Sequence, residues 1–203
     1  MPELPADVVA RLSVHAGMVL RVVFSSSYRA LMFWSYMETL YYSRIQSPVG
    51  TLILGVSAKG LVALDFDRGQ FPPKMNKSVS WQESKEATRD YVDELNQYFA
   101  GRRRDFTFAL DLRGTPFQIQ CWRALLDIPY GETRTYADIA RSVGRPHAYR
   151  AVGMANNRNP TAIVVPCHRV IASDGTLCGY GGGLDVKSKL LALEGAQPIR
   201  STP

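Results

Sequence analysis

The strongest constraint on the fold is a set of helix start and stop signals in the second half of the chain. Thr115 precedes a proline and is followed three positions later by a glutamine, which is the pattern of a capped helix start. Thr135 and Asp138 repeat this pattern, and Gly144 ends the helix that they open. A third helix is expected over residues 148–157. Two short helices joined by a tight glycine-containing turn indicate a helix-turn-helix unit in a mainly helical C-terminal domain.

The first half of the chain has the periodicity of strands. Short β-branched or aromatic runs at residues 41–45, 51–56 and 61–66 are separated by turn residues, which predicts a small antiparallel sheet. Apolar residues then follow helical spacing over residues 84–101, and residues 106–112 alternate as a strand would. The predicted fold class is therefore α/β, of the α+β kind, with a mixed N-terminal domain and a helical C-terminal one.

Three segments are expected along the chain. Residues 1–40 fit neither pattern and are treated as an unassigned N-terminal extension. Residues 41–112 form the N-terminal α/β domain, and residues 113–203 form the C-terminal domain. No stretch reaches the roughly 18 apolar residues that a membrane span needs, so no membrane partner is expected.

The net charge of +6 is distributed unevenly along the chain. Residues 1–110 hold 13 basic and 11 acidic residues, a surplus of +2, while residues 111–203 hold 11 and 7, a surplus of +4. A more basic C-terminal half fits a polyanionic partner.

The cysteine and histidine content limits the chemistry that the chain can perform. It has three cysteines and three histidines, with no C-x-x-C pair. An odd number of cysteines does not predict a secreted disulfide framework and fits a reducing, cytoplasmic interior. No histidine lies at metal-ligand spacing from a cysteine pair, so we expect no zinc or other metal site.

A candidate nucleophile follows an apolar run at residues 163–165, which we interpret as a buried strand that ends near Cys167. A thiolate forms when a nearby histidine takes the proton, and a carboxylate can orient that histidine. His168 is adjacent, and Glu194 ends the helix expected over residues 186–193. Neighbouring side chains of a strand point apart, so His168 serves Cys167 only if the chain turns or a water bridges them. The alternative is a buried, inert cysteine beside a surface histidine, which is the commoner situation for an isolated pair.

The wider motif decides between these alternatives. Residues 114–195 resemble the O6-alkylguanine-DNA alkyltransferase family almost throughout, and residues 41–112 resemble its N-terminal domain more loosely. The matching strings are Gly114-Thr115-Pro116-Phe117-Gln118, Ile128-Pro129-Tyr130-Gly131-Glu132-Thr133, Arg150-Ala151-Val152-Gly153, Asn159-Pro160, Pro166-Cys167-His168-Arg169-Val170-Ile171, Gly179-Tyr180-Gly181-Gly182 and Leu190-Leu191-Ala192-Leu193-Glu194-Gly195. The chain departs from the family at Thr135, usually serine, and at Cys121, usually valine, which we interpret as core packing.

The resemblance implies a fold, an activity and a partner. The N-terminal domain would be ribonuclease H-like, and the C-terminal domain would bind DNA and accept the alkyl group. The implied activity is repair by direct reversal, in which the alkyl group of O6-alkylguanine moves irreversibly onto Cys167, one protein molecule per lesion and without a cofactor. The partner would be double-stranded DNA bearing that lesion, bound by a monomer. Whether methyl or bulkier groups are preferred, and whether O4-alkylthymine is also a substrate, stays open.

The resemblance also implies roles for individual residues. Cys167 would be the nucleophile, His168 a water-mediated base, Glu194 the acid that orients it, Tyr136 the hydrogen-bond donor to the flipped guanine, and Asn159 the residue that shapes the active-site turn. Arg150 would be the intercalating finger of a helix in the minor groove. The other implied DNA-binding residues are Thr135, Ala148, Ala151, Gly153 and Arg169. The implied pocket residues are Pro166, Val170, Tyr180 and Gly181.

Three other functions fit parts of this pattern. A non-catalytic protein that recognises alkylated DNA is the main alternative, but such proteins carry another residue where Cys167 stands. A regulator that senses alkylation would need an additional zinc domain with a cysteine cluster. A cysteine hydrolase would leave the basic helix-turn-helix unexplained. Cys178 lacks the flanking motif and is expected to be dispensable.

Overall fold

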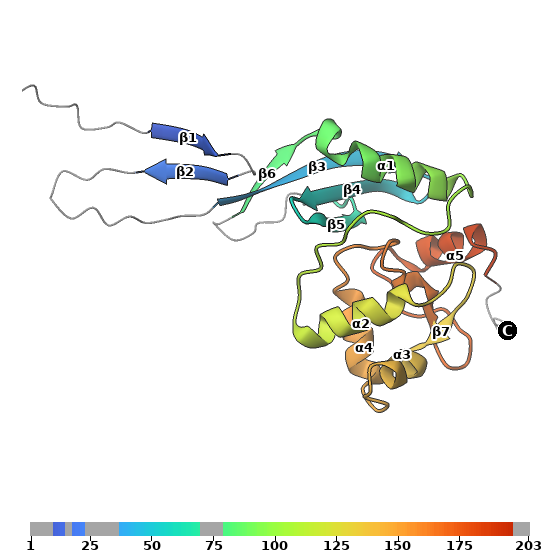
Figure 1. Cartoon of the computed structure of the whole chain (residues 1–203). Coiled ribbons are helices and arrows are strands. Elements are labelled where there is room, and N and C mark those ends of the chain that lie inside the picture. The colour runs from blue at the N-terminus through green and yellow to red at the C-terminus, as the bar shows by residue number, and fades with distance from the viewer. Residues whose placement is uncertain (1–9, 15–17, 23–36, 70–78, 197–203) are drawn as a thin grey trace, which may run out of the picture.

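The computed structural model describes residues 10–14, 18–22, 37–69 and 79–196 (Figure 1). Most of the expected extension over residues 1–40 lies outside the described residues. Its described parts include strands β1 (Ala10–Val14) and β2 (Met18–Val22), which pair antiparallel. β2 also pairs with the first residues of β3 (Met37–Ser47). The central sheet therefore begins ahead of residue 41, where the sequence analysis placed the start of the domain.

The antiparallel meander that the sequence predicts is confirmed. β3 pairs with β4 (Gly50–Ser57), and β4 pairs with β5 (Gly60–Phe66), each through a two-residue turn. A further strand, β6 (Val79–Glu83), pairs parallel to β3. β6 was not predicted from the sequence; three of its five residues are polar, and its short alternation of Val79-Ser80-Trp81-Gln82 was missed.

The prediction of a strand over residues 106–112 is wrong. Only Leu110 forms a β-bridge, to Leu61, and the Leu61 amide donates to the Ala109 carbonyl over 2.9 Å. The segment passes so close to the β4–β5 turn that a Cβ on Gly60 would lie 2.2 Å from the Ala109 oxygen. Its aromatic side chains stack on α1 instead of alternating across a sheet; the ring of Phe108, for example, lies 4.7 Å from that of Tyr91.

The helices lie where the capping signals predict them. Ser84 caps α1 (Lys85–Phe99), and Thr115 caps α2 (Pro116–Leu126) in a complete capping box with Gln118. Thr135 and Asp138 form the second box, at the start of α3 (Tyr136–Ser142). The remaining elements are β7 (Arg134–Thr135), α4 (Tyr149–Asn157), the 3-10 turn η1 (Cys167–Arg169), β8 (Val170–Ile171) and α5 (Leu184–Leu193).

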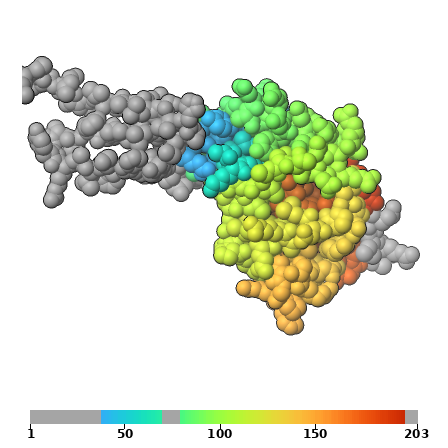
Figure 2. Space-filling view, viewed as in Figure 1, coloured from blue at the N-terminus to red at the C-terminus, as the bar shows by residue number. Residues whose placement is uncertain are grey.

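The core of the described residues consists of two apolar clusters, one of which contains residues of both domains. One cluster surrounds Trp122 and joins α2, α3 and α4, which form the end of the molecule away from the sheet (Figure 2). The other fills the space between the sheet and α1, and it includes Ile163 and Leu190 from the C-terminal domain. A fully buried leucine or isoleucine contributes about 1.5–3 kcal/mol. The N-terminal domain is therefore stabilised by the segment that leads to Cys167 and by α5.

No helix in the described part of the chain is long and apolar enough to cross a membrane.

Candidate active site

Cys167 stands in a tight turn and not at the end of a strand, so that prediction is wrong. Ile163 has a φ of +73°, which a β-branched residue adopts only under strong constraint from its surroundings. The backbone folds back on itself there, with the Val165 amide donating to the Thr161 carbonyl over 2.9 Å. Cys167 then opens the 3-10 turn η1. A buried turn and a buried strand need the same apolar residues, so the sequence could not separate them.

Asn159 ties this turn to the nucleophile. Its Nδ2 donates to the Val165 carbonyl over 2.7 Å and to the Cys167 Sγ over 3.2 Å, and its Oδ1 accepts from the Thr161 amide over 3.1 Å. One side chain thus fixes both ends of the turn and provides a donor to the sulfur. A donor at the sulfur stabilises a thiolate more than a thiol.

His168 contacts Glu194, the acid that the sequence analysis named as its partner. The distance between His168 Nε2 and Glu194 Oε1 is 2.9 Å, and both side chains are fully buried. The other ring nitrogen, Nδ1, is buried and has no hydrogen-bond partner among the described residues. Because η1 turns the chain directly after Cys167, the two neighbours are not forced to opposite faces as in a strand. His168 therefore has one nitrogen anchored and one nitrogen available.

Arg169 is placed differently from its predicted role as a DNA contact. Its side chain is 8% exposed, its Nε and Nη2 donate to Glu194 over 2.8 and 2.9 Å, and its Nη1 donates to the Ile128 carbonyl over 2.6 Å. A guanidinium fits a carboxylate in this two-pronged geometry. The position of Arg169 thus contradicts the predicted DNA contact and makes it the counter-charge of Glu194. Burial alone would raise the pKa of Glu194, but the hydrogen bonds from His168 and Arg169 lower it to about 2.

Burial of the Cys167 thiol and its polar neighbours have opposite effects on its pKa. Burial raises the pKa of Cys167, while the Asn159 hydrogen bond and the positive charge of Lys187 act to lower it. Burial also lowers the pKa of His168, which keeps the ring neutral and able to accept a proton. The resting site therefore pairs a protonated thiol with a neutral imidazole.

Lys187 is a site residue that the sequence analysis missed. Its side chain is fully buried, and its Nζ donates to the carbonyls of Val170 and Cys178 over 2.5 and 2.8 Å. It joins β8 to the loop before α5 and brings a positive charge near Cys167. A usable signal was present, because Lys187 lies on the same helical stripe as the apolar residues Leu190 and Leu191.

Tyr136 and Tyr180 flank the site from the helix-turn-helix and from the glycine-rich loop. Tyr136 is half-buried, and burial together with the neighbouring Cys178 raises the pKa of this tyrosine. Its ring lies 3.6 Å from the position of a Cβ on Gly153. The ring of Tyr180 stands edge-on to His168, with centroids 6.4 Å apart, and its hydroxyl is buried without a partner among the described residues.

The other predicted pocket residues, Pro166, Val170 and Gly181, are engaged in contacts within the protein. Pro166 and Val170 are buried, and Val170 packs in the core of the C-terminal domain. The carbonyl of Gly181 accepts a hydrogen bond from the guanidinium of Arg68, which follows β5. The glycine-rich loop is thus attached to the N-terminal domain. Cys178 lies nearer to the site than its lack of a motif implied; its dispensability stays a prediction.

Apart from Arg169, the predicted DNA-binding residues lie in α4 or at the N-caps of α3 and α4. Arg150 is exposed in the first turn of α4, with its guanidinium 5.9 Å from the ring of the exposed Tyr149. Ala148 and Ala151 are its small neighbours, whereas the hydroxyl of Thr135 is engaged with Asp138 in the capping box. Residues 134–158 contain five arginines and one acidic residue. This segment is therefore strongly basic, and small residues flank the exposed Arg150.

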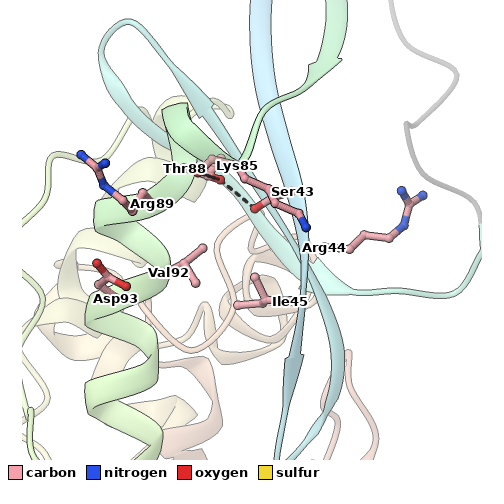
Figure 3. A pocket seen from close by; sticks show the side chains of 8 residues that line it. All are labelled: Ser43, Arg44, Ile45, Lys85, Thr88, Arg89, Val92 and Asp93. Atoms are coloured by element: carbon pink, nitrogen blue, oxygen red, sulfur yellow. Dashed lines mark hydrogen bonds between the residues drawn. The ribbon is translucent and has the colours of Figure 1, made fainter.

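A separate pocket lies between β3 and α1 (Figure 3). Ser43 and Thr88 meet in it through a hydrogen bond of 2.8 Å, and Lys85, Arg89 and Asp93 lie along its edge. None of its lining residues belongs to the site around Cys167. Within the described ranges, no cluster of three or more His, Cys, Asp or Glu side chains could hold a metal ion.

A buried cysteine with an acid-oriented histidine, set beside a basic helix-turn-helix, defines a DNA-binding protein with a nucleophilic thiol. Family models place the chain more narrowly. Residues 40–112 match the 6-O-methylguanine DNA methyltransferase ribonuclease-like domain, and residues 116–196 match the DNA binding domain of the same family. The chain belongs to the methylated-DNA–protein-cysteine methyltransferase family.

Individual relatives agree with this assignment. The Methanosarcina barkeri methylated-DNA–protein-cysteine methyltransferase is 51% identical over 155 residues, which covers 76% of this chain and 97% of the relative. The crystal structure of Mycobacterium tuberculosis O6-methylguanine methyltransferase matches with a TM-score of 0.70 and 48% identity, over 77% of this chain and 93% of the other. Mycobacterium tuberculosis OGT in complex with DNA matches with a TM-score of 0.69 and 48% identity, over 76% and 92%. The α+β fold class is thereby confirmed.

Proposed function

We propose that this protein repairs DNA by moving the alkyl group of O6-alkylguanine onto the Sγ of Cys167. The observation that carries the proposal is the anchored histidine, whose Nε2 is held by Glu194 while its buried Nδ1 lacks a protein partner. Such a ring can take the thiol proton. Relatives of this chain are named methylated-DNA–protein-cysteine methyltransferase, which describes methyl transfer from DNA to a protein cysteine. Direct reversal of DNA damage by a methyltransferase is the function of this chain.

The proton and bond changes balance with the side chains present. The Cys167 thiol gives its proton to His168 Nδ1 through a water, and the thiolate attacks the alkyl carbon. The S–C bond forms as the C–O6 bond breaks, and the departing guanine receives a proton from the Tyr136 hydroxyl. The imidazolium proton then restores Tyr136. Because a thioether has no good leaving group, the S–C bond is not broken again and each molecule acts once.

The lesion must leave the duplex to reach a buried thiol. Flipping a base costs a few kcal/mol, and a side chain that fills the vacated space offsets part of that cost. Arg150 is the candidate because it is exposed in the first turn of α4 beside small neighbours. The proposed partner is a duplex that carries O6-alkylguanine, bound by one protein molecule per lesion.

Intact-mass measurement tests this function. The protein is incubated with a duplex that contains one O6-methylguanine, and the adduct is located by peptide mapping. We expect one methyl group per chain, on Cys167, with unmodified guanine left in the DNA. Binding of the lesion without any gain in mass would instead identify a non-catalytic recognition protein.

Replacing Arg150 with alanine is expected to slow transfer from duplex DNA selectively. Loss of the side chain that fills the vacated space should reduce the single-turnover rate by about 10- to 100-fold, which corresponds to about 1.4–2.8 kcal/mol of the flipping cost. A single-stranded oligonucleotide has no stacked partner strand, so its rate should change far less. Arg158→Ala is the matched control, because Arg158 is exposed at the end of the same helix. Equal losses on both substrates would contradict the finger role.

A further inference from the structure

The N-terminal domain reaches the reactive centre through a side chain that no motif marks. Tyr98 lies in the last turn of α1, and its hydroxyl donates to Glu194 Oε1 over 2.8 Å. Both residues are buried, Tyr98 with 0% and Glu194 with 5% of its surface exposed. The hydrogen bond therefore crosses the domain boundary in the interior, where solvent does not replace it.

We propose that Tyr98 is a positioning residue for alkyl transfer, which acts by holding the Glu194 carboxylate that orients His168. The proposal rests on the proposed function, in which His168 takes the proton of Cys167. It gives the N-terminal domain a direct part in the chemistry, in addition to its packing against the C-terminal domain.

The ring of Tyr98 is fixed, so its hydroxyl has one direction to point. Aromatic neighbours surround it, with ring centroids 5.3 Å away at Phe99, 5.5 Å at Phe106 and 6.1 Å at Tyr130. Burial and the negative charge of Glu194 raise the pKa of Tyr98 far above its usual range. The hydroxyl thus keeps its proton and stays a donor throughout the working pH range.

The donors on Glu194 are divided unequally between its two oxygens. Oε1 accepts from Tyr98, from His168 Nε2 and from Arg169 Nη2, over 2.8, 2.9 and 2.9 Å. Oε2 accepts from Arg169 Nε over 2.8 Å and from the Gly131 amide over 3.3 Å. Because Tyr98 and His168 share one oxygen, the strength of one hydrogen bond limits the other. Without the Tyr98 hydroxyl, the negative charge on Oε1 is shared with one donor fewer. It then stabilises protonated His168 more strongly, which raises the pKa of that histidine.

Tyr98, Glu194 and His168 form a hydrogen-bonded relay. Other charged and titratable groups face this relay from several elements. Those in electrostatic contact with His168, Glu194 or Tyr98 are Arg169 from η1, Lys187 from α5, and Tyr130 and Tyr180 from the loops. Arg104 lies over the Tyr130 ring, and Cys167 and Asp65 act on Tyr180. A Tyr98→Phe change alters none of these groups, so a shift in the titration of His168 reports the lost hydroxyl.

The test compares pH profiles of single-turnover methyl transfer for the wild type, Tyr98→Phe and Tyr130→Phe. Protonation of His168 removes the base, so the rate falls on the acid side. We expect Tyr98→Phe to move the midpoint of this fall upward by about 0.5–1 pH unit, in line with a lost hydrogen bond to a charged group. Tyr130→Phe is the matched control, since the Tyr130 hydroxyl donates to the Leu193 carbonyl and not to Glu194. Its midpoint should equal that of the wild type.

An unchanged midpoint in Tyr98→Phe would overturn the proposal, even if the maximal rate fell. A lower rate with the same midpoint is the result expected if Tyr98 only packs against its neighbours. Equal shifts in both variants would overturn it too. A measurement on the wild type avoids any folding defect of the variants: NMR should show a slowly exchanging Tyr98 hydroxyl proton close to the His168 Nε2 proton, and rapid exchange would count against the proposal. Failure of the proposed function is distinct, because the wild type would then gain no methyl group.

Discussion

Replacing Cys167 with alanine should abolish alkyl transfer and leave a folded protein that still binds alkylated duplex DNA. No other thiol is placed to substitute. Cys121 is fully buried in the core around Trp122, and Cys178 lies in the loop before α5, outside the turn in which Asn159 donates to the Cys167 sulfur. Loss of one buried sulfur costs about 1 kcal/mol of stability, which the fold should tolerate.

The measurement is intact mass after incubation with duplex DNA that carries one O6-methylguanine, together with a melting curve. Cys178→Ser is the comparison, because serine is close to cysteine in size and keeps a polar group near Tyr136. This variant should gain one methyl group per chain on Cys167. A methyl group on folded Cys167→Ala protein would show that another residue is the acceptor. Absence of the adduct in folded Cys178→Ser would show that the second thiol is needed.

Replacing Glu194 with glutamine is expected to cause the largest loss of stability of any single substitution in the relay. The carboxylate compensates the buried charge of Arg169 and accepts from four residues, which are His168, Arg169, Tyr98 and Gly131. Breaking a buried ion pair by removing one partner typically costs about 3–5 kcal/mol, because the other charge stays buried and uncompensated. For a chain of this size that lowers the melting temperature by about 10 °C. Transfer should also slow sharply as His168 loses its anchor.

The loss should depend on pH in a defined direction. Glu194 has an ordinary pKa of 4.5 and a pKa of about 2 in the folded protein. A lowered folded-state pKa means that the unfolded chain binds the proton more readily, so the stabilisation is complete above 4.5 and is lost as the pH falls toward 2. Glutamine resembles the protonated acid, so the difference between wild type and variant should shrink over that window.

Urea unfolding at pH 7 and at pH 3 measures this difference. Glu132→Gln is the matched control, since Glu132 pairs with Arg134 on the surface with half of its side chain exposed, and such pairs contribute about 0–1 kcal/mol. If Glu194→Gln were as stable as Glu132→Gln at pH 7, the carboxylate would not be the counter-charge that its contacts indicate. A difference at pH 3 as large as that at pH 7 would argue against the lowered pKa.

The helices of the C-terminal domain could be predicted from the sequence because the forces that start and stop them are local. The hydroxyl of Thr115 accepts from the amide of Gln118, three residues away, and Thr135 does the same with Asp138. Such contacts are present in the sequence as spacing. The reactive string around Cys167 was equally visible, and the family it indicated is the family to which the chain belongs.

The contacts that organise the site were decided by tertiary structure. Tyr98 and Glu194 are 96 positions apart, and nothing near Tyr98 in the sequence marks it as a donor to a carboxylate. Arg169 stood inside the predicted motif, yet packing turned it toward Glu194 and away from DNA. The apolar run that contains Ile163 became a turn because Asn159 captures the backbone ahead of Cys167. Local sequence thus determined which elements form and which residue reacts, whereas the partners of the buried polar groups depended on which distant segments the shared core brings together.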